Sequence, residues 1–268
     1  KPREVRYSMA LTVEEKIEKV KELRPIDDVL FEVLAEDREV CEEMLRVILE
    51  DDKLIVHDVI TQSDQRNIYG RSVRLDALCT LGDGSKCNIE VQRSDNDNHL
   101  KRVRFNAASI TVKDSNPGER FEKVIELKVV YISEFDVFRK SKTIYHVDKI
   151  LRETGDVVDD GLHEIFVNAA INDGSDIAEL MQSFKQQMVD NPKFPKLSDR
   201  MKLLKETQGG ASAVCAVMER YEKLALRKDH IDRIQNLLKK GYSKKFILDL
   251  DYTEDEYNEA KKELLLIK

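Results

Sequence analysis

Tryptophan is missing from this 268-residue sequence, and aromatic residues make up only 6% of it. Charged residues make up 36% and apolar residues 41%. So few aromatic side chains among so many charged ones argue against an all-β sandwich of short strands and favour a soluble, partly helical chain. The apolar content is sufficient for one sizeable core with a helical region added to it.

Long apolar segments are missing as well. No run approaches the roughly 20 apolar residues that span a bilayer, and the amino-terminal residues lack the order typical of a signal peptide. We therefore expect a cytoplasmic protein with no membrane contact. The cysteines lack the paired close spacing of zinc ribbons and CxxC redox sites, so we expect reduced core thiols at Cys41, Cys79, Cys87 and Cys215.

Motifs of several enzyme classes are also absent. The five histidines have no HExxH or HxH spacing, which argues against a zinc centre, and we expect His99 to lie on the surface. No serine has the context of a nucleophile elbow, and residues 82–84 lack the length and the lysine of a phosphate-binding loop. The net charge of −7 gives no global attraction to nucleic acid, so any such site must be a local basic patch.

The apolar periodicity predicts a helix, three strands, a helix and a strand, in that order. A short helix at residues 12–24 comes first, and the helical pattern at 26–49 is divided at Glu36 and Asp37. Strands are predicted at residues 54–61, 71–81, 86–92 and 124–132, with a helix at 99–112 before the last strand. Beyond about residue 140 the predicted elements are helices, at residues 175–190, 198–208, 211–227, 229–240 and 253–266. The last of them opens with a capping box of Thr253 and Glu256.

Residues 71–92 predict a β-hairpin whose register the sequence itself selects. With a three-residue loop at residues 82–84 and Gly84 in the left-handed conformation, one face pairs apolar side chains: Cys79 with Cys87, Ala77 with Ile89, and Leu75 with Val91. The other face then pairs Leu78 with Asn88, Asp76 with Glu90, and Arg74 with Gln92. A two-residue turn would mix the two faces, so the longer loop is preferred.

This register sets the carboxylates of Asp76 and Glu90 opposite each other, with Cβ atoms roughly 4.5 to 5.5 Å apart, where like charges repel. A divalent cation such as Mg²⁺ would offset the repulsion, because it accepts carboxylate oxygens together with waters and phosphate oxygens. Gln92 lies on the same face and can orient a water or a phosphate oxygen. The alternative is a solvated outer face on which Arg74 neutralises one carboxylate.

The clearest basic cluster follows the hairpin, at Arg93, Lys101, Arg102, Arg104 and Lys113. Such side chains would bind the phosphate backbone and carry no direct information about base sequence. The alternative is a solvated helix face with no ligand.

The order of Asp76, hairpin, Glu90-Val91-Gln92, basic helix and strand resembles the PD-(D/E)XK nuclease superfamily. It is most similar to the bacterial branch of recombination-promoting (Rpn-like) nucleases and transposases, in which Gln replaces the Lys of the founding motif. The resemblance also includes residues 25–28, 102–105 and 134–138, and it continues more weakly into residues 237–243.

This resemblance implies an α+β (α/β) fold with a restriction-endonuclease-like αβββαβ core at residues 25–140. A helical extension at residues 1–24 would precede the core, and a mainly α-helical region at 141–268 would follow it. The implied activity is Mg²⁺-dependent hydrolysis of DNA phosphodiesters, associated with transposition and recombination, with Mn²⁺ as a substitute cation. The implied partners are DNA and a second copy of the chain.

The resemblance also implies roles for single residues. Asp76, Glu90 and the backbone carbonyl of Val91 would hold the metal, and Gln92 would complete the catalytic set of Asp76, Glu90 and Gln92. DNA would contact Arg93, Lys101, Arg102 and Arg104. The family often adds an acid from its first core helix, and Asp28, Glu32 and Glu43 all remain candidates.

Gln92 departs from the founding pattern, because glutamine cannot ionise and cannot stabilise charge as lysine does. A second class of function therefore stays open. In it the chain is a weak or inactive nuclease fold that binds DNA or a protein partner through its helices.

Overall fold

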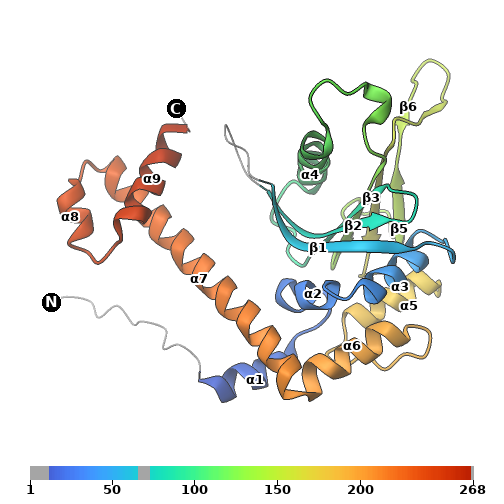
Figure 1. Cartoon of the computed structure of the whole chain (residues 1–268), viewed down its shortest axis with the longest axis horizontal. Coiled ribbons are helices and arrows are strands. Elements are labelled where there is room, and N and C mark those ends of the chain that lie inside the picture. Colours follow the sequence, from blue (N-terminus) through green and yellow to red (C-terminus); the bar gives the residue numbers. More distant parts are fainter. Residues whose placement is uncertain (1–11, 66–72, 267–268) are drawn as a thin grey trace. The chain divides into compact units, whose positions relative to one another are not determined.

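The computed structural model describes residues 12–65 and 73–266 (Figure 1). The first eleven residues of the predicted amino-terminal extension, and residues 71 and 72 of the strand predicted at 71–81, lie outside this range. The chain divides into two compact units, Lys1–Cys215 and Ala216–Lys268. The boundary that the sequence suggested at residue 140 lies inside the first unit.

The first unit contains a six-stranded mixed sheet in the order β1-β2-β3-β4-β8-β5. The first three strands are antiparallel, whereas β4 is parallel to both β3 and β8, and β5 is antiparallel to β8. The strands are β1 (Val56–Gln65), β2 (Val73–Leu81), β3 (Lys86–Gln92), β4 (Leu127–Ser133), β5 (Ile144–Val147) and β8 (Leu162–Asn168). A separate short hairpin pairs β6 (Lys149–Ile150) with β7 (Val157–Val158).

The four predicted strands correspond to β1, β2, β3 and β4, in the predicted order. The predicted αβββαβ order is therefore confirmed, and its strands form the first part of the mixed sheet of this α+β fold. The region beyond residue 140 is mainly helical, as predicted, but it also contains strands β5 and β8, which were not among the predicted elements. They add two strands to the sheet beside β4.

Helices cover both faces of this sheet (Figure 1). Helix α4 packs on one face against β2 and β4, while α2 and α3 pack on the other, with α5 and α6 against α3. Because both faces are covered, β3 is buried along residues 87–91. The helices of this unit are α1 (Val13–Glu22), α2 (Asp28–Ala35), α3 (Arg38–Ile48), α4 (His99–Asp114), the 3₁₀ turn η1 (Phe121–Lys123), α5 (Asp176–Phe184) and α6 (Pro195–Glu206).

The helix starts follow from local side chains. Asp37 caps α3 through the Glu39 N–H, which explains the division predicted at residues 36 and 37. Asn98 caps α4 by accepting the Lys101 N–H at 3.1 Å. Before α2, Lys205 of α6 donates to the backbone carbonyls of Lys21 and Leu23 and so fixes the segment that leads to α2.

The second unit has a small core of its own. It holds α7 (Gln208–Lys239) from Ala216 onward, together with α8 (Lys244–Leu248) and α9 (Glu254–Leu266). Its buried side chains are Ile231, Ile234, Ile247, Tyr257 and Ala260. The predicted capping box is confirmed, since Thr253 N donates to Glu256 and Glu256 N donates to Thr253 Oγ1. The helices predicted at 211–227 and 229–240 form one continuous helix, α7, and α8 was not predicted.

Over the described ranges, 12–65 and 73–266, the helices are all too short or too polar to cross a membrane.

Candidate active site

The β2–β3 hairpin has the loop and the register that the sequence predicted. Leu81 N donates to Ser85 O at 2.9 Å, and Gly84 has a φ of 87°, the left-handed conformation. Ala77 pairs with Ile89, Leu78 with Asn88, and Cys79 with Cys87. Asp76 and Glu90 therefore lie one position beyond the last paired residues, where the two strands separate.

The Asp76 carboxylate crosses to the neighbouring strand at this point. Its Oδ2 accepts the backbone N–H of Val91 at 3.0 Å, so a side chain continues the ladder after the backbone pairing has ended. Removal of water raises the pKa of Asp76 well above its usual range, and the charge of Glu90 adds to this shift. The Val91 N–H opposes it. The charges of the two carboxylates thus repel each other, although Asp76 and Glu90 are not paired through their backbones as the register predicted.

Glu90 is fully buried, with 0% of its surface exposed. Its Oε1 accepts the Asn88 Nδ2–H at 3.0 Å, while Oε2 has no hydrogen-bond partner among the described residues. The nearest cation is Arg102 Nη2, 3.9 Å from Oε2. Burial raises the pKa of Glu90 to about 7, although Asn88, Arg102 and the backbone N–H of Asp76 favour the charged form. Such burial excludes the alternative in which Glu90 lies on a solvated outer face.

The sequence left Asp28, Glu32 and Glu43 as candidates for a third acid of the site, and Asp28 is the one whose charge acts on both Asp76 and Glu90. Its negative charge raises the pKa of both Asp76 and Glu90. Loss of water raises the pKa of Asp28 itself, and the charge of Arg102 opposes the shift. Asp28 is the first residue of α2, and part of its side chain is exposed to solvent.

The other two acids are placed differently. Glu43 accepts the backbone N–H groups of Lys196 and Leu197 at 3.0 and 2.9 Å and so caps the first turn of α6. Glu32 is buried within α2, one turn beyond Asp28.

Gln92 ends strand β3 and is half-buried. Its Nε2 donates to the backbone carbonyl of Ser94 at 3.0 Å. The carboxamide is therefore turned toward the segment that leaves the strand, and its oxygen is the atom that can accept a hydrogen bond from a ligand.

Comparison with known proteins agrees with this geometry. The model of the PD-(D/E)XK nuclease family transposases matches residues 28–204, about two thirds of the chain. This chain belongs to that family. The match begins at Asp28 and includes the hairpin, α4, β4 and β8. No curated protein and no solved structure matches the chain.

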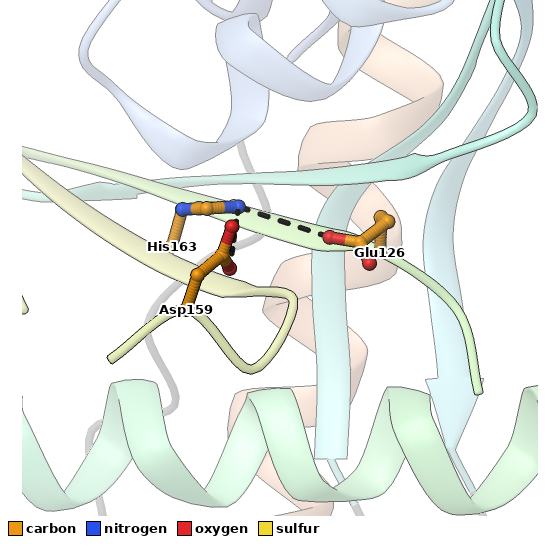
Figure 2. A group of neighbouring side chains, drawn as sticks. All are labelled: Glu126, Asp159 and His163. Atoms are coloured by element: carbon orange, nitrogen blue, oxygen red, sulfur yellow. Dashed lines mark ion pairs between the residues drawn. The ribbon is translucent and has the colours of Figure 1, made fainter. Parts of the chain in front are cut away.

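Nucleases of the PD-(D/E)XK family generally use divalent metals. Figure 2 shows a second place where donors of the metal-binding type gather: Glu126, Asp159 and His163. His163 Nε2 lies 3.8 Å from Glu126 Oε2 and 3.9 Å from Asp159 Oδ1. These residues lie at the start of β4 and β8, whereas Glu90 pairs with Tyr131 further along β4. Glu126 and Asp159 are exposed and His163 is half-buried, so this group lies at the surface and apart from Glu90.

The predicted DNA-binding residues of this family member do not form one patch. Arg102 is half-buried and directed toward Glu90, whereas Lys101 and Arg104 are exposed and line a groove between α4 and the β5–β8 edge. Lys113 lies three turns further along α4. The groove also contains Leu100, Val147, Asp148, Lys149, Leu162 and Glu164.

Arg93 has protein partners instead. Its Nη1 lies 2.5 Å from Asp27 Oδ1, and its Nε lies 3.4 Å from Glu134 Oε2. Arg24 binds the same glutamate through Nη1 at 2.6 Å. This ion-pair network connects the segment before α2 with the ends of β3 and β4, next to the carboxylate pair.

Two residues beside the site were not identified from the sequence. Asn88 holds Glu90, and its only sequence signal was its place on the same strand face. His99 was expected on the surface, which is wrong, since it is only 6% exposed. Its Nδ1 lies 2.8 Å from the Tyr131 hydroxyl and its Nε2 lies 3.0 Å from Asp95 Oδ1.

Proposed function

We propose that this chain is a divalent-cation-dependent DNA endonuclease whose centre is formed by Asp28, Asp76 and Glu90. The observation that carries the proposal is Oε2 of Glu90, which accepts no hydrogen bond from the described residues although its carboxylate is fully buried, and whose ion-pair partner Arg102 Nη2 lies 3.9 Å away. Buried polar atoms without a partner are rare in native proteins, and a bound water or ion is one explanation for them. A cation between Glu90 and Asp76 would satisfy that oxygen and offset the repulsion of the two carboxylates.

The donor set fits a hard cation. Carboxylate oxygens and a backbone carbonyl, with no cysteine or histidine ligand, suit Mg²⁺, with Mn²⁺ as the closest substitute. Val91 is the residue proposed to supply the carbonyl. Its N–H already donates to Asp76, so the same peptide segment lies beside the carboxylate.

When bound, the cation would supply Lewis acidity to the scissile phosphate and to the attacking water. The chain's own groups would do the rest. Gln92 would hold the water through its carboxamide oxygen, and the Arg102 guanidinium would neutralise charge on the phosphate oxygens. The water oxygen would form a bond to phosphorus while the bond from phosphorus to the leaving sugar oxygen breaks, and a proton equivalent to the one lost by the water would end on that sugar oxygen as its hydroxyl.

DNA is proposed as the substrate because of the family, and the link with transposition rests on the family's description alone. Lys101 and Arg104 are the residues proposed to hold the phosphate backbone outside the centre, because both are exposed on α4. A homodimer stays a prediction from the resemblance, which sedimentation would test.

One observation favours the second candidate, a weak or inactive nuclease fold that binds DNA or a protein. Gln92 cannot ionise, and its Nε2 already donates to the Ser94 carbonyl. It therefore offers a hydrogen bond but no positive charge to the reacting phosphate.

The test is nicking of a supercoiled plasmid with Mg²⁺, with Mn²⁺ and with EDTA. Wild type, Asp76→Ala and the control Asp58→Asn would be compared, because Asp58 is an exposed acid on the neighbouring strand β1. We expect cation-dependent nicking that is lost in folded Asp76→Ala and kept in the control. If the folded wild type nicks the plasmid with neither Mg²⁺ nor Mn²⁺, the binding protein becomes the better candidate.

A further inference from the structure

Asn88 is an amide at a position where its cross-strand neighbours are apolar. It lies in the middle of β3, opposite Leu78 of β2 and Val129 of β4. Its exposure is 0%, and Leu78 and Val129 belong to the hydrophobic core under α4. An apolar β-branched side chain would fit this position without the cost of burying an amide. The amide is therefore unfavourable for folding unless it serves the site.

The hydrogen bonds of the Asn88 side chain indicate a role in the site. Its Nδ2 donates to Glu90 Oε1 at 3.0 Å, whereas its Oδ1 has no hydrogen-bond partner in the described part of the chain. Glu90 Oε2 also accepts no hydrogen bond from the described residues, and Arg102 Nη2 lies 3.9 Å from it. Two buried acceptors two residues apart on one strand face cannot satisfy each other while Glu90 is ionised, because neither then carries a proton. They need a cation or a donor such as water.

Another buried asparagine of the same sheet shows what a structural role looks like. Asn168 donates to the carbonyl of Lys142 at 3.1 Å and accepts the Ala170 N–H at 2.9 Å. Both ends of that amide are used to hold backbone. Asn88, in contrast, gives its one side-chain bond to a carboxylate.

We infer that Asn88 is a positioning residue of the metal centre. Its NH₂ group holds Oε1 of Glu90, which would leave Oε2 for the cation, and its own Oδ1 would be available to accept from a water. The inference rests on the proposed function. A glutamate has three rotatable bonds, and a side chain that fixes its carboxylate typically changes metal affinity by about 10- to 100-fold.

The two carboxylates are held by different means, which makes the inference testable. Asp76 is held by a backbone N–H that no substitution at Val91, short of proline, can remove. Glu90 is held by a side chain, which can be replaced without touching either carboxylate.

The test is the affinity for Mn²⁺ alone, without DNA, by isothermal titration calorimetry of the full chain. Asn88→Leu is close in size, and Asn88→Val suits a buried strand, so each removes the amide and keeps the apolar packing. Asn106→Leu is the control, because Asn106 is a buried asparagine on α4 whose Nδ2 has no partner within the described residues. Glu90→Gln marks the loss of a ligand.

We expect wild type and Asn106→Leu to bind Mn²⁺ alike, and a folded Asn88 variant to bind it about 10- to 100-fold more weakly. Wild-type affinity in a folded Asn88 variant would overturn the inference, as would equal weakening by Asn106→Leu. Unfolding of both Asn88 variants would make the residue structural and would also overturn it. If wild type binds no Mn²⁺, or if Glu90→Gln does not weaken the binding, the proposed function is rejected and this inference with it.

Discussion

The backbone N–H of Val91 donates a hydrogen bond of 3.0 Å to Asp76 Oδ2, from one strand of the hairpin to the other. The bond lies just beyond the last backbone pair, Ala77 with Ile89. Asp76 therefore has two functions that substitution can separate. It extends the pairing of β2 with β3, and it contributes negative charge to the site.

Asp76→Asn and Asp76→Ala should have the same effect on cutting and different effects on stability. Both remove the charge and abolish nicking. Asparagine retains an oxygen that can accept the Val91 N–H, whereas alanine leaves that N–H unpaired, at a cost of about 1 to 3 kcal/mol. Urea denaturation in EDTA measures the difference. Relief of repulsion should leave Asp76→Asn as stable as wild type or more stable. Nicking by folded Asp76→Asn would contradict the proposed centre.

The stability of the cation-free protein should fall as pH rises. The pKa of Glu90 is raised to about 7 from an ordinary value of 4.5, so the folded state binds its proton more tightly than the unfolded state does. This contribution to stability is fully present below pH 4.5 and is lost as the pH passes through about 7. The raised pKa of Asp76 acts in the same direction, and the groups facing Glu90 are Asp76, Asp28 and Arg102.

Thermal melting in EDTA between pH 5 and pH 8 tests this linkage. Wild type should lose more stability over the range than Glu90→Gln, by on the order of a few kcal/mol. Because a cation favours the charged carboxylates, added Mg²⁺ should stabilise wild type more at pH 8 than at pH 5. Parallel curves for wild type and Glu90→Gln would show that Glu90 does not titrate in this window.

The basic residues near the hairpin should divide into two groups. Lys101→Gln and Arg104→Gln should each weaken DNA binding evenly across sequences and lower the salt dependence by about one unit of slope. Arg93→Gln should leave that slope unchanged and lower stability, because its guanidinium binds Asp27 and Glu134. Fluorescence anisotropy with a labelled duplex at several salt concentrations gives the slopes. A slope change for Arg93→Gln as large as that for Lys101→Gln would place Arg93 at the DNA.

The local sequence was sufficient to predict the β2–β3 hairpin, because the alternation of apolar and polar side chains, together with Gly84, determines both the loop and the strand pairing. Strand β3 was predicted at residues 86–92 and is found there. Strand β8 was not predicted, because it joins the sheet through a parallel pairing with β4, and no local turn marks such a long connection. Helix α7 was predicted as two helices, although residues 211–239 contain no glycine or proline that would end one.

The roles of single charged residues were less accessible. The sequence shows Arg93 as one member of a basic run, but its partners Asp27 and Glu134 lie 66 and 41 positions away in the chain. The choice among the three candidate acids, Asp28, Glu32 and Glu43, likewise depended on contacts between distant parts of the chain. Glu43 is excluded only because its carboxylate caps α6, more than 150 positions later. Such choices depend on tertiary contacts that no local pattern contains.

The contact between His99 and Tyr131 provides a last prediction. The His99 ring is buried at the start of α4, and the Tyr131 hydroxyl lies beside it on β4, the strand that pairs with β3 at Glu90. Tyr131→Phe leaves one ring nitrogen of His99 without a partner, which should cost about 1 to 3 kcal/mol in urea denaturation. His99→Leu should leave the buried hydroxyl unpaired, with a similar cost.

The double variant decides whether the two groups depend on each other. Because it removes both polar partners together, its free energy of unfolding should exceed the value expected from adding the two single losses. A coupling of about 0.5 kcal/mol or more would show that the bond stabilises the start of α4, one turn before Arg102. If the two losses add, His99 is held by Asp95 and by its ring contact with Phe135 instead.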